Sequence, residues 1–194
     1  MTSGAFAILD SVDVAELAKS SAVPSIRLRR AVASDAQAIG AVFDAAVRDG
    51  WTFLGERVRR PMFSARYWDA LVGDHAPPNA LLVATESAHG VVGFTAAHAE
   101  DGEMFLLFVE PAHAGRGIGR VLLSAAQDVL RAAGRTEAFL FVEERNARAL
   151  AVYAAAGYRH GGTVRESDFE GAALRELRLV KALSNPPPRR LRWD

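Results

Sequence analysis

Three glycines within five residues, Gly115-Arg-Gly-Ile-Gly119, follow a strongly apolar run and open a long helical pattern. A helix N-terminus offers unpaired backbone N–H groups and the positive end of the helix dipole. Glycine has no Cβ to keep an anion away from those groups, so the cluster predicts a phosphate cradle, with Arg116 and Arg120 adding positive charge. The alternative is that the glycines only permit a tight turn between a strand and a helix.

Two common phosphate loops fit this cluster poorly. A P-loop requires Lys and then Ser or Thr after its last glycine, whereas Arg120-Val121 follows Gly119. A dinucleotide-binding fold places its glycines after the first strand, with an acidic residue about 20 residues further on. Here several strand-like runs come before the loop, and Glu137 lies before the next strand rather than at its end.

Hydrophobic periodicity predicts the elements that must position this loop. Ser34 and Gln37 have the spacing of a capping box at the start of one helix. Met104–Val109 is continuously apolar, which predicts a central strand buried on both faces. The predicted helices are Ser11–Lys19, Asp35–Arg48, Pro61–Val72, Gly117–Ala133 and Asn146–Ala156, and the predicted strands are Ile26–Arg30, Ala80–Glu86, Val91–His98, Glu103–Val109, Ala138–Val142, Tyr158–Arg165 and Leu174–Val180.

This order predicts one α+β (mixed α/β) domain of three layers over residues 25–183, because antiparallel hairpins come first and a strand–helix–strand–helix unit follows. Residues 1–24 are expected to form an N-terminal extension. Residues 184–194, rich in proline and arginine, are expected to form a flexible tail.

Composition excludes several functions. The 194 residues carry 23 Lys and Arg against 23 Asp and Glu, so neither nucleic acid nor an anionic membrane is an expected partner. There is no cysteine, which excludes disulfides, cysteine metal sites and a thioacyl-enzyme intermediate. The histidines show no metal-ligand spacing, and no metal site is predicted. No apolar run is long enough to span a membrane and the start is a poor signal peptide, so the cytoplasm is the expected location.

Two segments together resemble the GNAT superfamily of N-acetyltransferases. The run Leu107–Leu123, LFVEPAHAGRGIGRVLL, is similar to the acyl-CoA-binding segment of that family, and Asn146–Tyr158, NARALAVYAAAGY, is similar to its Asn…Tyr…Gly-aromatic segment. The resemblance covers roughly Ile26 to Leu183. It implies a central, mostly antiparallel sheet that is splayed at the cofactor site and flanked by helices.

The resemblance also implies acetyl-CoA (coenzyme A) as the cofactor. The pantetheine arm would lie in the gap beside the central strand and pair with its backbone, and the glycine loop would hold the pyrophosphate. One departure is Ala114, where the family usually carries Arg or Gln, and we expect weaker CoA binding for that reason. The cofactor residues so implied are Leu107, Phe108, Val109, Ala114, Gly115, Arg116, Gly117, Ile118, Gly119, Arg120, Asn146, Ala149 and Tyr153.

The same resemblance assigns the chemistry of acetyl transfer. Asn146 and Tyr153 are seven residues apart and share a helix face, so Asn146 could bind a pantetheine amide while Tyr153 protonates the departing thiolate. The alternatives are a helix cap and a core tyrosine. Glu103 is the candidate base, because six residues separate it from Val109 and a regular strand would place both on one face. His98 and Glu100 are rival bases, and a solvated turn residue is the other interpretation of Glu103.

The acceptor is expected to be a small-molecule primary amine, attacked in a ternary complex without a covalent enzyme intermediate. Trp51, Phe53 and Glu56 are the candidate substrate-binding residues, although the aromatic rings could equally anchor a loop. A non-catalytic acyl-CoA-binding module and a protein N-acetyltransferase are the alternative functions. A homodimer is possible, and the sequence does not select the amine.

Overall fold

A computed structural model describes residues 23, 25–169 and 171–184. The predicted helix Ser11–Lys19 and nearly all of both terminal segments lie outside the described residues. None of the helices in these ranges is long and apolar enough to cross a membrane. The elements in chain order are β1 (Ile26–Arg30), η1 (Ala33–Asp35), α3 (Ala36–Gly50), η2 (Thr52–Arg59), α4 (Ala65–Asp74), β2 (Ala80–Glu86), β3 (Gly90–His98), β4 (Glu103–Val109), η3 (Pro111–His113), α5 (Ile118–Ala132), β5 (Glu137–Glu143), α6 (Ala147–Ala155), β6 (Arg159–Phe169) and β7 (Ala172–Ala182).

The strands form one seven-stranded sheet in the order β1-β2-β3-β4-β5-β7-β6. Neighbouring strands are antiparallel except β4 and β5, which are parallel and are paired only between Glu103 and Phe139. Beyond that pair the two strands diverge. The predicted mixed α/β class, and a mostly antiparallel sheet splayed at its centre, are therefore confirmed.

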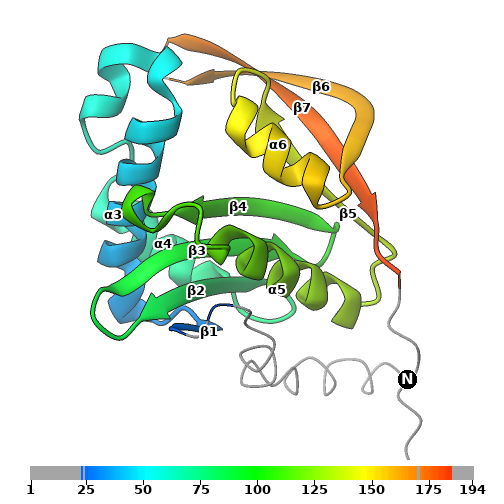
Figure 1. Cartoon of the computed structure of the whole chain (residues 1–194), viewed down its shortest axis with the longest axis horizontal. Coiled ribbons are helices and arrows are strands. Elements are labelled where there is room, and N and C mark those ends of the chain that lie inside the picture. The colour runs from blue at the N-terminus through cyan, green and yellow to red at the C-terminus, as the bar shows by residue number, and fades with distance from the viewer. Residues whose placement is uncertain (1–22, 24, 170, 185–194) are drawn as a thin grey trace, which may run out of the picture.

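Helices cover both faces of the sheet (Figure 1). The α5 helix packs on one face, where Ile118 and Leu122 join Leu82 and Leu140 in a core that is almost fully buried. The α3 and α4 helices pack on the opposite face around Phe94. The α6 helix lies against the β5–β7 half of the sheet, across the divergence from α5 (Figure 1).

The caps of α3 and α4 differ from those predicted. The α3 helix has no Ser34–Gln37 capping box: its N-cap is Asp35, whose carboxylate accepts from the Val32 amide at 2.8 Å. Arg29 holds the same carboxylate with contacts of 2.5 and 2.8 Å. The α4 helix begins at Ala65 rather than Pro61, because Ser64 supplies the cap by accepting from the Tyr67 amide at 3.3 Å.

The prediction that β4 is buried on both faces is wrong. Met104 is its one fully buried residue, and Phe105 is 40% exposed. The cause is the divergence from β5, which leaves one edge of the strand without a neighbour over most of its length.

A bulge in β4 changes which side chains share a face. Ala97 pairs with Met104 and Ala96 pairs with Leu106, so Phe105 is an additional residue on this strand. As a result Met104 and Val109 pack in the α5 core although five residues separate them. Glu103, next to Met104, is therefore on the opposite face from Val109, and the expectation that these two share a face is wrong.

Candidate active site

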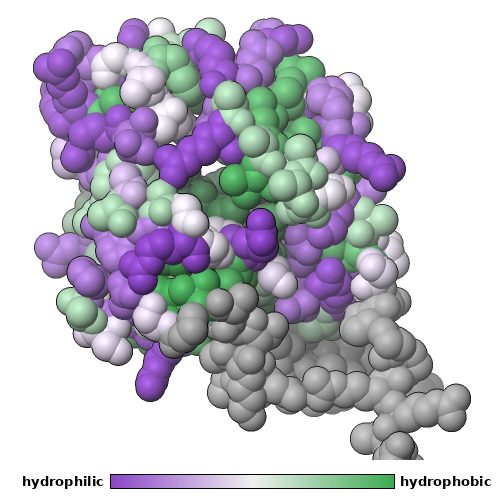
Figure 2. Space-filling model, in the orientation of Figure 1, coloured by the Kyte–Doolittle hydropathy of each residue, from purple (hydrophilic) through white to green (hydrophobic). Residues whose placement is uncertain are grey.

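A cavity of about 720 Å³ opens beside the second half of β4, the half that has no β5 partner. Figure 2 shows this face of the molecule hollowed there, with hydrophobic side chains gathered around the hollow. The volume is in the range of small-molecule sites. The wall is built from the end of α3, the second half of β4, the glycine loop, α5 and α6, with Lys181 from β7.

The glycine loop has the backbone that the cradle requires. Gly115 and Gly117 have φ of 77° and 85°, which an L side chain rarely adopts, and Gly117 is the N-cap of α5. The amides of Arg120 and Val121 both donate to the Gly117 carbonyl at 3.1 Å. Amides earlier in the turn precede the helical ladder, so they can face an anion at the helix N-terminus.

Of the thirteen cofactor residues implied by the resemblance, all except Arg116 line this cavity. The Arg116 guanidinium instead lies 2.6 Å from Glu86 Oε1 and 3.3 Å from Ser25 Oγ. Arg120 does lie in the wall, as does Ala114. The loop therefore presents one arginine to the cavity and holds the other against β2.

Asn146 and Tyr153 both line the cavity, from the two ends of α6. Asn146 is the N-cap, and its Oδ1 accepts from the Ala149 amide at 3.1 Å, which leaves the side-chain NH₂ as a donor. The expected cap and the expected cofactor contact are thus compatible. Burial, with a smaller contribution from Tyr158, raises the pKa of the Tyr153 phenol far above its ordinary value. Its hydroxyl has no hydrogen-bond partner within the described part of the chain.

Glu103 does not lie at the cavity. It begins β4, whereas the cavity is lined by Leu107–Val109 near the other end of that strand. Its carboxylate faces His98, with Oε2 3.8 Å from Nδ1, and this neighbouring carboxylate raises the pKa of His98. Among the described residues of the wall, the one carboxylate is Asp49, near the end of α3. Asp49 was not among the site residues predicted from the sequence, although it lies two residues before Trp51, which was.

The expected substrate residues separate into two groups. Trp51 lines the cavity, while Phe53 and Glu56 do not. Phe53 stacks on Trp51 with centroids 6.1 Å apart and is covered by the Arg145 guanidinium at 4.3 Å, so it supports Trp51 from behind. Glu56 pairs with Arg59 at 2.9 Å on the exposed side of η2.

Residues 43–158 match the model of the acetyltransferase (GNAT) family. The chain belongs to this family. A mycothiol acetyltransferase of Clavibacter michiganensis is 37% identical over 108 residues, which are 55% of this chain and 31% of that protein. The chain spans only about a third of the length of such curated relatives.

Solved structures share the fold. YncA of Salmonella typhimurium, determined with its cofactor acetyl-CoA, has a TM-score of 0.66 at 20% identity over 84% of this chain and 96% of its own. The spermidine N-acetyltransferase of Vibrio cholerae, in complex with CoA and spermine, has a TM-score of 0.64 at 18% identity over 84% of this chain and 98% of its own. The cofactor of the family is acetyl-CoA, as the resemblance implied.

Proposed function

We propose that this GNAT protein transfers the acetyl group of acetyl-CoA to the primary amine of a small molecule, by direct attack in a ternary complex. The observation that carries the proposal is one cavity whose wall holds the glycine loop, the open edge of β4 and Tyr153. The amine nitrogen attacks the thioester carbonyl carbon, the C–S bond breaks, and the electron pair leaves on the CoA sulfur. The amine loses one proton in the same sequence.

The cofactor end of the cavity follows from the backbone. The pyrophosphate binds the amides of the glycine loop and the side chain of Arg120, and pantetheine extends along Leu107–Val109. Donors of β4 near Val109 polarise the thioester carbonyl. Apart from Arg120, these contacts are made by main-chain groups on strand and helix ends, so they tolerate Ala114 in place of the usual long side chain.

Tyr153 acts on the leaving group. A free thiol has a pKa of about 8.5, well below that of the buried phenol, so complete transfer of the phenolic proton to the thiolate is unfavourable. The hydroxyl therefore stabilises the thiolate by donating a hydrogen bond while remaining protonated. This refines the role of general acid that the sequence suggested.

The acceptor end lies between Asp49 and Trp51. Asp49 attracts an ammonium group and accepts its proton directly or through water, and Trp51 covers the apolar part of the molecule. Arg148 pairs with Asp49 at 3.1 Å, and a cationic amine would compete for that carboxylate. The solved relative that holds spermine and the relatives named for mycothiol make polyamines and mycothiol-related amines the first classes to test. The homodimer stays a prediction.

The decisive experiment incubates the full chain with acetyl-CoA and a panel of amines, and follows release of the CoA thiol. We expect Tyr153→Phe to lower kcat about 100-fold with little change in the acetyl-CoA Kd. Tyr67→Phe is the matched control, because Tyr67 lies in α4 outside the cavity. Asp49→Asn should raise the KM of the amine, and Glu103→Gln should leave kcat unchanged. Tight acetyl-CoA binding without turnover of any amine would instead support a binding module.

A further inference from the structure

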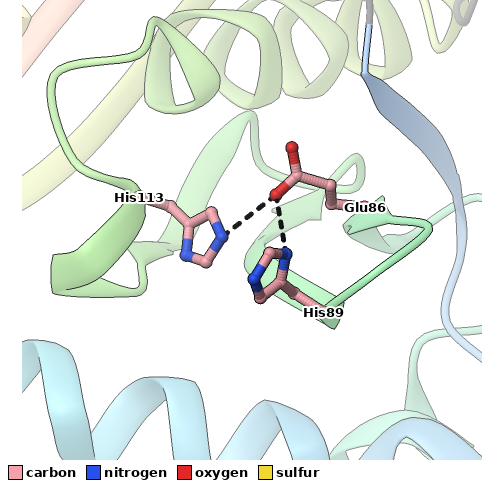
Figure 3. A group of neighbouring side chains, drawn as sticks. All are labelled: Glu86, His89 and His113. Atoms are coloured by element: carbon pink, nitrogen blue, oxygen red, sulfur yellow. Dashed lines mark hydrogen bonds and ion pairs between the residues drawn. The ribbon is translucent and has the colours of Figure 1, made fainter.

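A second group of chemically competent side chains lies outside the acetyl-transfer cavity, except that His113 borders both. Glu86 ends β2, His89 is in the turn to β3, and His113 is in η3 (Figure 3). Glu86 Oε2 lies 3.1 Å from His89 Nδ1 and 3.1 Å from His113 Nε2. One ligand atom from each residue falls within 4.8 Å of the other two. Two imidazoles and a carboxylate thus converge from two separate segments.

Charged groups surround these three side chains. His113 is 5% exposed, and Glu110 Oε2 lies 2.9 Å from its Nδ1, but that nitrogen makes no hydrogen bond to the described residues in this arrangement. A carboxylate that accepts the proton on the second nitrogen of a histidine directs the first nitrogen at a metal, and a small rotation of the His113 ring would bring Glu110 into that role. The Arg116 guanidinium lies 2.6 Å from Glu86 Oε1 and 3.3 Å from Oε2, so it holds the carboxylate in place, while the shorter contacts of Oε2 are to the two histidines.

We propose that Glu86, His89 and His113 form a binding site for Zn²⁺ or a similar transition-metal dication. Zn²⁺ bonds of 2.0–2.2 Å in a tetrahedron place ligand atoms about 3.3 Å apart, close to both 3.1 Å separations. The His89 side chain is 56% exposed, so its rotation can bring the two imidazoles together, and water can fill the fourth position. Two imidazole nitrogens exclude Mg²⁺ and Ca²⁺ as the preferred ions.

The charges near the site favour a dication. Glu86 and Glu110 are anionic, Arg116 is cationic, and neutral histidines add nothing, so the group holds a net charge of about −1 when the imidazoles act as ligands. Sequence spacing did not reveal the site, because Glu86 and His89 are three residues apart while His113 follows 24 residues later. An ion here would join the β2–β3 turn to the start of the glycine loop.

The test titrates Zn²⁺ alone into the full chain in competition with a chromophoric chelator, and repeats the titration with Co²⁺ to record visible d–d bands. We expect one equivalent bound with micromolar or tighter affinity, lost in both His89→Ala and His89→Gln. Glutamine retains a hydrogen-bond donor but is a poor Zn²⁺ ligand, so it separates a metal site from a network of hydrogen bonds. Glu110→Gln should weaken binding about 10–100-fold.

Two control variants locate the ion. His160→Ala removes an exposed histidine in β6, and His98→Ala disrupts the other group of possible ligands, His98, Asp101 and Glu103. Both should retain the full equivalent, and far-UV circular dichroism should show every variant folded. Absence of Zn²⁺ binding at micromolar concentration, or binding that His89→Ala and His89→Gln leave intact, would overturn the proposal and leave the three residues as an ion-pair network.

Discussion

Alanine at two glycines of the loop should affect stability in opposite directions. Gly117 has φ of 85°, and nothing in its surroundings is closer to an added Cβ than Val23 at 3.5 Å, so the cost of Gly117→Ala is conformational. A left-handed non-glycine residue costs about 1–2 kcal/mol, or about 2–8 °C in Tm for a chain of this size. Gly119 is helical, and its Cβ would meet Val109 at 3.7 Å, an ordinary contact. Gly119→Ala should therefore stabilise the helix by up to about 1 kcal/mol.

Both substitutions should nevertheless weaken acetyl-CoA binding. Gly117→Ala distorts the amides of the cradle, and Gly119→Ala places a methyl group on the cavity wall between α5 and β4. The measurements are urea unfolding for stability and isothermal titration calorimetry for the Kd. Gly134→Ala is a matched control, since Gly134 also has a positive φ, of 79°, but lies at the other end of α5. It should lose stability and keep its Kd. Equal destabilisation by Gly117→Ala and Gly119→Ala would refute the conformational argument, and an unchanged Kd in both would refute the cradle.

Three further predictions concern charge. Ala114→Arg should tighten acetyl-CoA binding about tenfold through a charge-assisted contact to phosphate, and an unchanged Kd would contradict our account of this departure. Arg29 lowers the pKa of Asp35, so Asp35→Asn should lower the free energy of unfolding by about 2 kcal/mol at pH 7. This contribution is present above pH about 3.9 and is lost as the pH falls through the lowered pKa, which acid unfolding of the native protein and the variant would show. Glu103 raises the pKa of His98, so Glu103→Gln should destabilise the protein below pH about 6.5. The destabilisation should disappear as the pH rises through the raised pKa of His98, and a difference in unfolding free energy that persists at alkaline pH would contradict the pairing.

Local patterns in the sequence predicted the parts of the site that depend on local structure. The glycine loop needs a strand before it and a helix after it, and both are visible in periodicity. The seven-residue spacing of Asn146 and Tyr153 likewise placed both at one cavity. The prediction that Glu103 shares a strand face with Val109 was wrong because the extra residue Phe105 reverses the alternation of side chains. A bulge inside a continuously apolar run cannot be recognised from the sequence pattern. Asp49 was missed because its place in the wall depends on where the end of α3 meets Arg148 of α6 in the folded chain.

The divergence of β4 from β5 connects these observations. A strand inside a sheet satisfies its backbone groups on both edges, whereas Leu107–Val109 pair with β3 on one edge and have no β5 partner on the other. Unpaired groups at an interior edge require water or a ligand. On the proposed function, pantetheine pairs with this free edge of β4. The lack of a β5 partner beside Leu107–Val109 therefore both lowers the burial of β4 and creates the cofactor site. Acetyl-CoA should then act as an eighth strand would, and mass action gives the scale: at 100 times its Kd it should stabilise the fold by about 2.7 kcal/mol.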